Sequence, residues 1–284
     1  MARLLLNPRN PAFGEDNILL HGHARRHYAA GVHAPLSIKT IIRGEGRWKT
    51  TEGEFLVDSS NLLVVNEDQE YSLTIDAAQP VETFCLFFKP GFADLAGEFR
   101  ERTHSFHAPV GVRMRAIHAA GPNAEPLWLD AQLYAIAEDM RQLVADERER
   151  TAAIPALKAS TRNELFRRVS RAKAWLDIHF DESPDMETAA RDACLSPYHF
   201  HRVFTRAFGV TPHRYVVEKR LARAAHLLAT TRQPVVEVCA AVGFQSLGSF
   251  STLFRTRFGI TPARARNQQD SRNIPAGNKR ILTT

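Results

Sequence analysis

One block of this chain occurs twice at a fixed separation. Aligning residues 189–214 on residues 239–264 without a gap gives nine identities in 26 positions. The identical pairs are Ala190/Ala240, Ser196/Ser246, Phe200/Phe250, Phe204/Phe254, Phe208/Phe258, Gly209/Gly259, Thr211/Thr261, Pro212/Pro262 and Arg214/Arg264. A constant offset of this kind indicates a duplicated supersecondary unit. A bare helical repeat without a nucleic-acid role is disfavoured, because solenoids need at least about three repeats.

Each copy predicts two short helices joined by a tight turn. We expect the helices at residues 186–193 and 198–207 in the first copy, and at 235–242 and 247–257 in the second. Ser196 followed by Pro197 is a strong helix start, and Gly209 is placed to end that helix. The phenylalanines fall on one apolar stripe, which leaves the other side of the second helix polar. This pattern is typical of a helix-turn-helix motif.

The two copies together resemble the C-terminal DNA-binding domain of the AraC/XylS family of transcriptional regulators. The resemblance covers roughly residues 160–266. It is carried by two blocks that occur at the right separation, residues 196–204 with 208–212, and residues 243–246 with 250–251, 254–255 and 258–262. It implies that the partner is double-stranded DNA, and that an activator would also contact RNA polymerase.

The resemblance also implies which side chains contact DNA. Tyr198, His201 and Arg202 align with base-reading positions, and arginine to guanine is the commonest specific contact. We expect His199 and Arg206 to touch phosphate or to flank that contact. The second helix departs from the family pattern, because Gly248, Ser249 and Thr252 are short where relatives often carry longer polar side chains. We therefore expect the second motif to position the protein rather than to specify sequence, through helix N-terminal amides and two arginines, Arg255 and Arg257.

The segment between the motifs predicts a connecting helix from Pro212 to about Ala229. Eighteen residues at 1.5 Å each make a rod of about 27 Å. The major groove returns to the same side of B-DNA about every 34–36 Å. We therefore expect the rod to set both reading helices in successive grooves, on two half-sites arranged as direct repeats.

Charge is divided unevenly along the chain. Residues 160–284 carry 20 Lys and Arg against 10 Asp and Glu, whereas residues 1–159 carry 17 against 21. A basic half fits a polyanionic partner, because neutralised phosphates release counterions. Charge alone leaves open a solvated basic face without a partner.

The first hundred residues predict a small β-barrel or sandwich. Short β-rich segments are separated by turn signals such as Gly44-Glu45-Gly46. The predicted strands are 17–23, 36–43, 47–50, 61–66, 71–75 and 81–88. The family resemblance implies a cupin-like barrel that binds a small effector, and the expected fold class is therefore α+β with two domains, an N-terminal cupin-like β-barrel and a C-terminal all-α domain. The aromatic side chains either line an effector pocket or, more simply, form core: Trp48, Phe55, Tyr71, Phe84 and Phe87.

Four histidines near the N-terminus invite a metal interpretation. His21 and His23 would share one face of a strand, as two ligands do in metal-binding cupins. Such a site also needs a carboxylate shortly afterwards and a histidine from a later strand. Residues 24–27 contain no carboxylate, and two arginines there would repel a cation. We therefore expect His21, His23, His27 and His33 to be surface or pocket-lining residues, with no metal and no cofactor. The rival hypothesis, a metal-dependent cupin enzyme with a DNA-binding appendage, lacks its ligands.

The middle of the chain predicts helices around an irregular stretch. We expect a helix at 92–102, irregular structure from His104 to Pro126, and a long helix from Pro126 to about Arg150. In relatives this helix packs against its counterpart in a dimer, and packing on its own barrel is the equal alternative. The expected domains are a regulatory region at 1–150, a linker at 151–160, the DNA-binding domain at 161–266 and a polar, disordered tail at 267–284.

Cysteine usage and hydropathy bear on the cellular compartment. Cys85, Cys194 and Cys239 lie in apolar stretches, and their odd number and wide spacing suggest reduced core residues. No apolar run approaches 18 residues, so we expect no membrane span and a cytoplasmic protein. A constitutive DNA-binding protein that only dimerises through residues 1–150 stays open. The sequence does not identify the effector or the operator.

Overall fold

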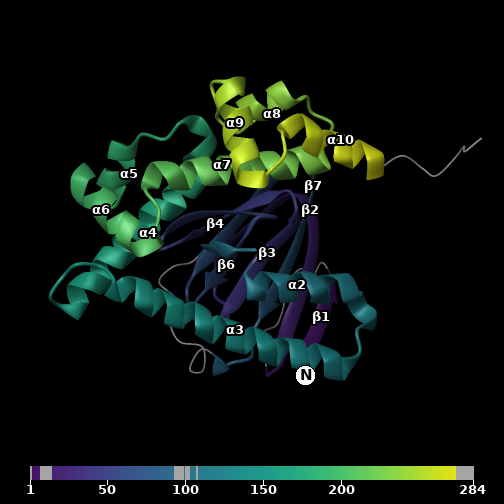
Figure 1. Ribbon diagram of the computed structural model, residues 1–284. Helices are drawn as coiled ribbons and strands as arrows, with labels where there is room; N and C mark the ends of the chain where they lie inside the picture. The colour runs from purple at the N-terminus through teal and green to yellow at the C-terminus, as the bar shows by residue number, and fades with distance from the viewer. Residues whose placement is uncertain (1, 7–14, 93–98, 100–102, 107, 273–284) are drawn as a thin grey trace, which may run out of the picture. The chain divides into compact units, whose positions relative to one another are not determined.

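The computed structural model describes residues 2–6, 15–92, 99, 103–106 and 108–272 (Figure 1). The chain divides into two compact units. The first comprises residues 1–178 with 185–212, and the second residues 179–184 with 213–284. The first helix-turn-helix motif thus lies in the same unit as the barrel. The functional segments expected from the sequence, 1–150, 151–160, 161–266 and 267–284, remain a prediction.

The N-terminal part is a near-closed β-barrel that is antiparallel except for its first strand pair. The sheet order is β1-β2-β7-β3-β6-β8, with β4 paired to β5 and β7. The strands are β1 (Ala2–Leu6), β2 (Asn17–Val32), β3 (Ser37–Arg43), β4 (Glu45–Thr50), β5 (Gly53–Asp58), β6 (Asn61–Val65), β7 (Tyr71–Phe87) and β8 (Thr103–Ser105). The expected fold class is confirmed, both for this barrel and for the helical C-terminal region.

Strand β7 is continuous where the sequence suggested two strands, 71–75 and 81–88. Its first part pairs with β4 and its second part with β3. Between them, the register with β2 shifts from Asp76 to Val81. Pro80 lies in this interval and has no N–H for a ladder hydrogen bond, so the pattern is interrupted although the strand continues. Strands β1, β5 and β8 were not expected from the sequence.

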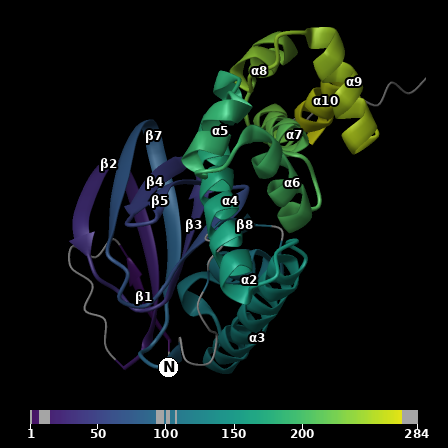
Figure 2. The ribbon, with the colours of Figure 1, turned by 90° about the vertical axis from the view of Figure 1, so that its left-hand side faces the viewer.

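Two apolar cores lie on opposite faces of the sheet. One contains Trp48, Phe55, Tyr71 and Phe87 between the strands, so these aromatic residues are core. The other packs Phe84 and neighbouring strand residues against helices α2 (Pro109–Ala120) and α3 (Pro126–Ala152). Figure 2 shows both helices on one side of the strands.

Helix α3 packs on its own barrel, as one of the two alternatives that the sequence left open predicts. Leu133, Ile136, Met140 and Val144 are buried in the core shared with the strands. Helix α2 overturns the expectation of irregular structure between His104 and Pro126. Pro109 stands in its first turn and Gly121 at its end, so the residues interpreted as breakers are its boundaries. The helix expected at 92–102 lies largely outside the described residues.

Helices α4 (Ala159–His179), α5 (Met186–Asp192) and α6 (Pro197–Phe208) complete the first unit. A buried polar contact ties α4 to the barrel. Lys173 Nζ donates to Thr103 Oγ1 of β8 at 3.1 Å, and that hydroxyl donates to Asp177 Oδ2 at 3.3 Å. Phe166 of α4 lies 6.0 Å from Phe208 of α6, measured between ring centroids. The first motif is therefore built on a helix that is also anchored in the barrel.

The second unit holds helices α7 (Pro212–Thr230, from His213 onward), α8 (Val235–Ala241), α9 (Leu247–Phe258) and α10 (Pro262–Arg272). Its core joins Leu221, Ala224 and Leu228 of α7 to Phe250 and Phe254 of α9. Helix α10 continues past residue 266, which corrects the expectation of a disordered tail from 267. Residues 273–284 lie outside the described part of the chain.

The structure confirms the duplicated unit, but the first helices of the two motifs, α5 and α8, are offset by 49 residues rather than fifty. Cys194 and Gly243 have positive φ angles, 52° and 84°, at equivalent points of the two turns. The buried Ala190 corresponds to the buried Cys239, whereas Ala240 is exposed. The gapless pairing of Ala190 with Ala240 is therefore wrong, because the second turn is one residue longer. From the serine caps onward the offset of fifty holds.

Candidate nucleic-acid interface

Helix α6 presents a polar face opposite its phenylalanines. Ser196 accepts a hydrogen bond from the His199 amide at 3.4 Å and caps the helix, as expected. Phe200 and Phe204 are buried, with ring centroids 5.5 Å apart. The apolar stripe thereby fixes the rotation of the helix and turns its other side to solvent. Of the five DNA-contact candidates here, His199 is half-buried and four are exposed, Tyr198, His201, Arg202 and Arg206.

Helix α9 repeats the same framework with different outward side chains. Ser246 caps it through the Ser249 amide at 3.3 Å, and the Phe250 and Phe254 rings lie 5.6 Å apart. The predicted contact residues on this helix are all exposed, Ser249, Thr252, Arg255 and Arg257. The framework is thus conserved between the copies, and only the reach and charge of the exposed face differ.

Arg257 has a partner that the sequence did not predict. Its Nε lies 2.7 Å from Glu218 Oε2 on α7. Both side chains are partly exposed, so the pair is screened by solvent. The guanidinium is nevertheless partly neutralised before any phosphate approaches. Arg255 is therefore the stronger candidate for a phosphate contact on α9.

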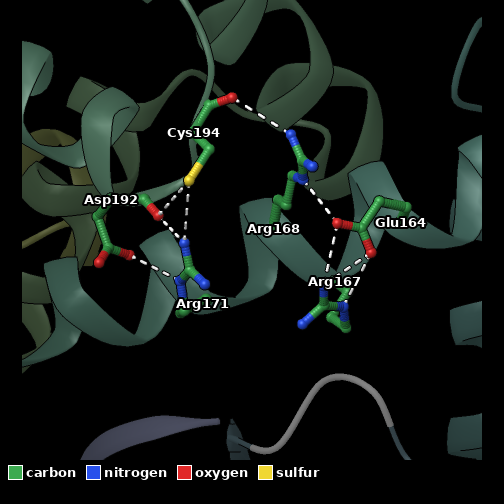
Figure 3. Close-up of polar contacts among 6 residues, drawn as sticks. All are labelled: Glu164, Arg167, Arg168, Arg171, Asp192 and Cys194. Carbon is green, nitrogen blue, oxygen red and sulfur yellow. Dashed lines mark hydrogen bonds and ion pairs between the residues drawn. The ribbon is translucent and has the colours of Figure 1, made fainter.

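Helix α4 holds the turn of the first motif through arginine side chains (Figure 3). Arg171 donates to the carbonyl of Asp192, and its Nε lies 3.3 Å from the carboxylate of the same residue. Arg168 Nη1 donates to the carbonyl of Cys194 at 3.3 Å. Arg168 is in turn oriented by Glu164, 2.7 Å away on the same helix. These contacts satisfy carbonyl groups that the end of α5 leaves without helical partners.

The turn of the second motif is held by close backbone packing instead. A Cβ atom at Gly243 would collide with the carbonyl oxygen of Asp181. Arg220 of α7 donates to the carbonyl of Phe180 at 2.6 Å, and its guanidinium lies 5.7 Å from the Phe244 ring centroid. The corresponding turns of the two motifs are thus stabilised by different contacts.

The cysteines only partly follow the expectation that all three are core residues. Cys85 and Cys239 are buried, but Cys194 is exposed at the turn between α5 and α6. Its neighbours Ala193 and Leu195 lie in the same turn, where Ala193 is buried and Leu195 half-buried, and Cys194 faces solvent.

A second polar cluster lies in the barrel, and sequence reasoning missed it. His21 Nε2 and His118 Nε2 lie 3.0 Å and 2.9 Å from the same oxygen of Glu82, Oε1, and His23 Nε2 lies 3.6 Å from it. Burial tends to raise the pKa of Glu82, but hydrogen bonds from His21 and His118 and the nearby imidazole charges outweigh it, so the pKa is lowered. The carboxylate was sought just after His23 in the sequence, whereas strand pairing brings it from β7.

The other N-terminal histidines lie apart from this cluster. His27 is exposed, and His33 lies 3.8 Å from Glu70. These two are surface residues, as expected.

Among the described helices, none combines the length and the hydrophobicity needed to cross a bilayer.

Comparison with known proteins places the similarity in the C-terminal region. Residues 189–268 match a family model described as a helix-turn-helix domain. The HTH-type transcriptional activator RhaS of Enterobacter sp. (strain 638) is 38% identical over 104 residues, which are 37% of this chain and 37% of that protein. The chain thus matches just over a third of the length of such relatives.

Two solved structures match a comparable share of this chain. The DNA-binding domain of AdpA in complex with a target DNA is 32% identical, with 38% of this chain and 97% of that one covered and a TM-score of 0.36. A transcriptional regulator with an AraC-type DNA-binding domain from Chromobacterium violaceum is 30% identical, with 39% and 96% covered and a TM-score of 0.33.

Proposed function

We propose that this protein is a sequence-specific transcription regulator of the AraC family, because residues 189–268 match a helix-turn-helix family model and the chain is similar to a RhaS activator. It binds double-stranded DNA through α6 and α9 in successive major grooves, and acts in the cytoplasm. The observation that carries this proposal is the repeated framework of two capped helices, each with buried phenylalanines and an exposed polar face.

The two helices contribute differently to recognition. Tyr198, His201 and Arg202 on α6 are long and carry hydrogen-bonding or charged ends, so they reach base edges. His199 and Arg206 contact phosphate or flank the bases. Helix α9 offers Ser249 and Thr252, whose short side chains reach few base edges. It positions the domain through its N-terminal amides and Arg255, with a smaller contribution from Arg257.

The barrel regulates this activity by binding a small effector or by dimerising. A cavity of about 330 Å³ opens beside α3 and supports the effector hypothesis. Phe88 and Phe92 stack there with ring centroids 3.9 Å apart. The lining carries two basic residues, Lys89 and Arg141, and two acidic residues, Glu15 and Asp130. Its volume falls in the usual range of small-molecule sites. Leu127 and Tyr134 of α3 are exposed and are available to a second copy. If the protein is an activator, it also contacts RNA polymerase.

Selection of bound sequences from a random DNA pool tests the proposal. The full chain is the right material, because the first motif shares a compact unit with the barrel. We expect one enriched motif with two half-sites in direct repeat, about one helical turn apart. Enrichment of no motif at moderate salt would show that the basic region binds DNA without sequence preference, and would contradict the proposal.

A further inference from the structure

The best unassigned site is the histidine–carboxylate cluster of the barrel. Its members come from three elements that are distant in sequence. His21 and His23 lie two residues apart on β2, Glu82 lies on β7, and His118 lies near the end of α2. The backbone ladder pairs His23 with Glu82 and His21 with Phe84, so the strand residues share one face.

Packing of α2 explains why His118 joins this group. Met114 and Ile117 of α2 are buried in the same core as Leu19 and Phe84 of the strands. Leu19, His21 and His23 alternate along one face of β2, and Phe84 and Glu82 do the same on β7. The face therefore changes from apolar to polar at the end of α2. The imidazole of His118 lies over that boundary, 5.2 Å from the Phe84 ring centroid.

The distances suit a metal ion. One nitrogen each of His21 and His118 and one carboxylate oxygen of Glu82 lie within 4.8 Å of one another. In a tetrahedral zinc site with bonds of 2.0–2.1 Å, ligand atoms lie about 3.4 Å apart. The contacts to Glu82 of 3.0 Å and 2.9 Å are close to that separation. His23 Nε2 lies 3.6 Å from the same oxygen but outside this group of three, so its side chain would have to turn inward to reach the ion.

The donor types select the kind of ion. Imidazole nitrogen with one carboxylate suits Zn²⁺ and similar first-row divalent ions, whereas Mg²⁺ and Ca²⁺ prefer oxygen ligands throughout. The side chains of His21, Glu82 and His118 are between 14% and 23% exposed. They are shielded enough to be held in place and open enough for an ion and a water molecule to enter.

We propose that His21, Glu82 and His118, with His23 as an additional ligand, bind one divalent transition-metal ion such as Zn²⁺. The ion replaces the direct contacts between the imidazoles and the carboxylate, and joins α2 to β2 and β7. Because it binds only the folded barrel, it raises the melting temperature of the protein. The site is independent of the proposed DNA contacts.

Zinc binding to the untagged full chain tests this directly. We use a Cys194→Ser background, because Cys194 is an exposed thiol that could bind zinc by itself. Isothermal titration at pH 7.5 should give one Zn²⁺ per chain, with no comparable response to Mg²⁺, and Zn²⁺ should raise the melting temperature. Glu82→Gln and His118→Ala should each weaken zinc binding by more than tenfold. Circular dichroism and unfolding without metal check that both variants remain folded.

The matched control is His33→Ala, which removes a histidine that faces a single carboxylate, Glu70, at 3.8 Å. This variant should bind one Zn²⁺ per chain with the same affinity as the parent protein. Absence of stoichiometric binding by the parent protein would overturn the proposal. Unchanged binding by both folded ligand variants would place the ion elsewhere and would overturn it equally. If either Glu82→Gln or His118→Ala is unfolded, the remaining variant and His21→Ala show whether zinc binds at this site.

Discussion

Cys194 and Gly243 occupy the same left-handed backbone position in the turns of the two helix-turn-helix motifs, with φ angles of 52° and 84°. Only the first turn has room for a side chain. At Gly243 an added Cβ would collide with the carbonyl oxygen of Asp181. The second motif therefore tolerates a side chain at this turn position less well than the first motif does.

Gly243→Ala should destabilise the protein by more than the cost of the left-handed conformation. That cost alone is about 1–2 kcal/mol. The matched control is Gly259→Ala, which has φ of 75° with nothing within 4 Å of the added methyl group. Urea unfolding of both variants should show a clearly larger loss for Gly243→Ala. Equal losses would show that Asp181 moves aside without cost.

Arg171→Met should destabilise the first motif, because Arg171 satisfies the Asp192 carbonyl beside the turn. Hydrogen bonds that involve a charged group contribute about 1.5–3 kcal/mol. Arg167→Met is the control, since Arg167 pairs only locally with Glu164 in the contacts that the structure gives for it, and such pairs contribute about 0.5 kcal/mol or less. Thermal unfolding compares the two, and a larger effect of Arg167→Met would contradict the assignment.

Lys39 should make the stability of the barrel depend on pH. Its ammonium group is buried, donates to Tyr71 Oη at 3.1 Å and lies 3.6 Å from the Phe87 ring centroid. Burial lowers the pKa of Lys39 to about 7, against an opposing effect of Cys85. Between pH 7 and the usual lysine pKa, the unfolded chain holds a proton that the folded chain has lost. The free energy of unfolding should therefore rise with pH, by up to about 1.4 kcal/mol per unit.

The measurement is urea unfolding between pH 7 and pH 8. At higher pH the raised pKa values of Cys85 and Tyr71, both caused mainly by burial, reverse the trend, because these groups ionise first in the unfolded chain. Lys39→Met should flatten the rise between pH 7 and pH 8. Lys49→Met, at an exposed position, should leave it unchanged. Identical slopes in the parent protein and Lys39→Met would contradict the assignment.

The ion pair between Arg257 and Glu218 predicts unequal roles for the two arginines of α9. Arg255→Ala should weaken DNA binding at all sequences and reduce the salt dependence by about one phosphate contact. Arg257→Ala should have a smaller effect, because Glu218 already lies 2.7 Å from its guanidinium. Glu218→Gln should strengthen binding by freeing Arg257. Fluorescence anisotropy at several salt concentrations distinguishes these outcomes, and equal effects of both alanine variants would contradict the difference.

Local signals in the sequence predict the helical repeat well. Ser196 and Ser246 cap their helices, and Gly209 and Gly259 end them, because a cap depends on residues only three or four positions away. A gapless alignment could not detect the extra residue in the second turn. Most identities in that alignment lie in the second helix of each motif, from the serine cap onward, so they set the offset for the whole block.

Features that depend on distant parts of the chain were not predictable in this way. Glu82 meets His21 across a strand pair, 61 residues away in sequence, and His118 arrives through the packing of α2. A search for ligands near His23 therefore could not find them. The partner of Arg257 likewise lies on another helix, 39 residues away.

We propose that α6 reads the DNA sequence while α9 positions the domain. The measurement is the affinity of Arg202→Ala and Thr252→Ala for the selected site and for each of its single-base variants. Arg202→Ala should cost about 1–3 kcal/mol and relax specificity at one base pair, whereas Thr252→Ala should change little. Large and equal losses of specificity from both variants would contradict the account.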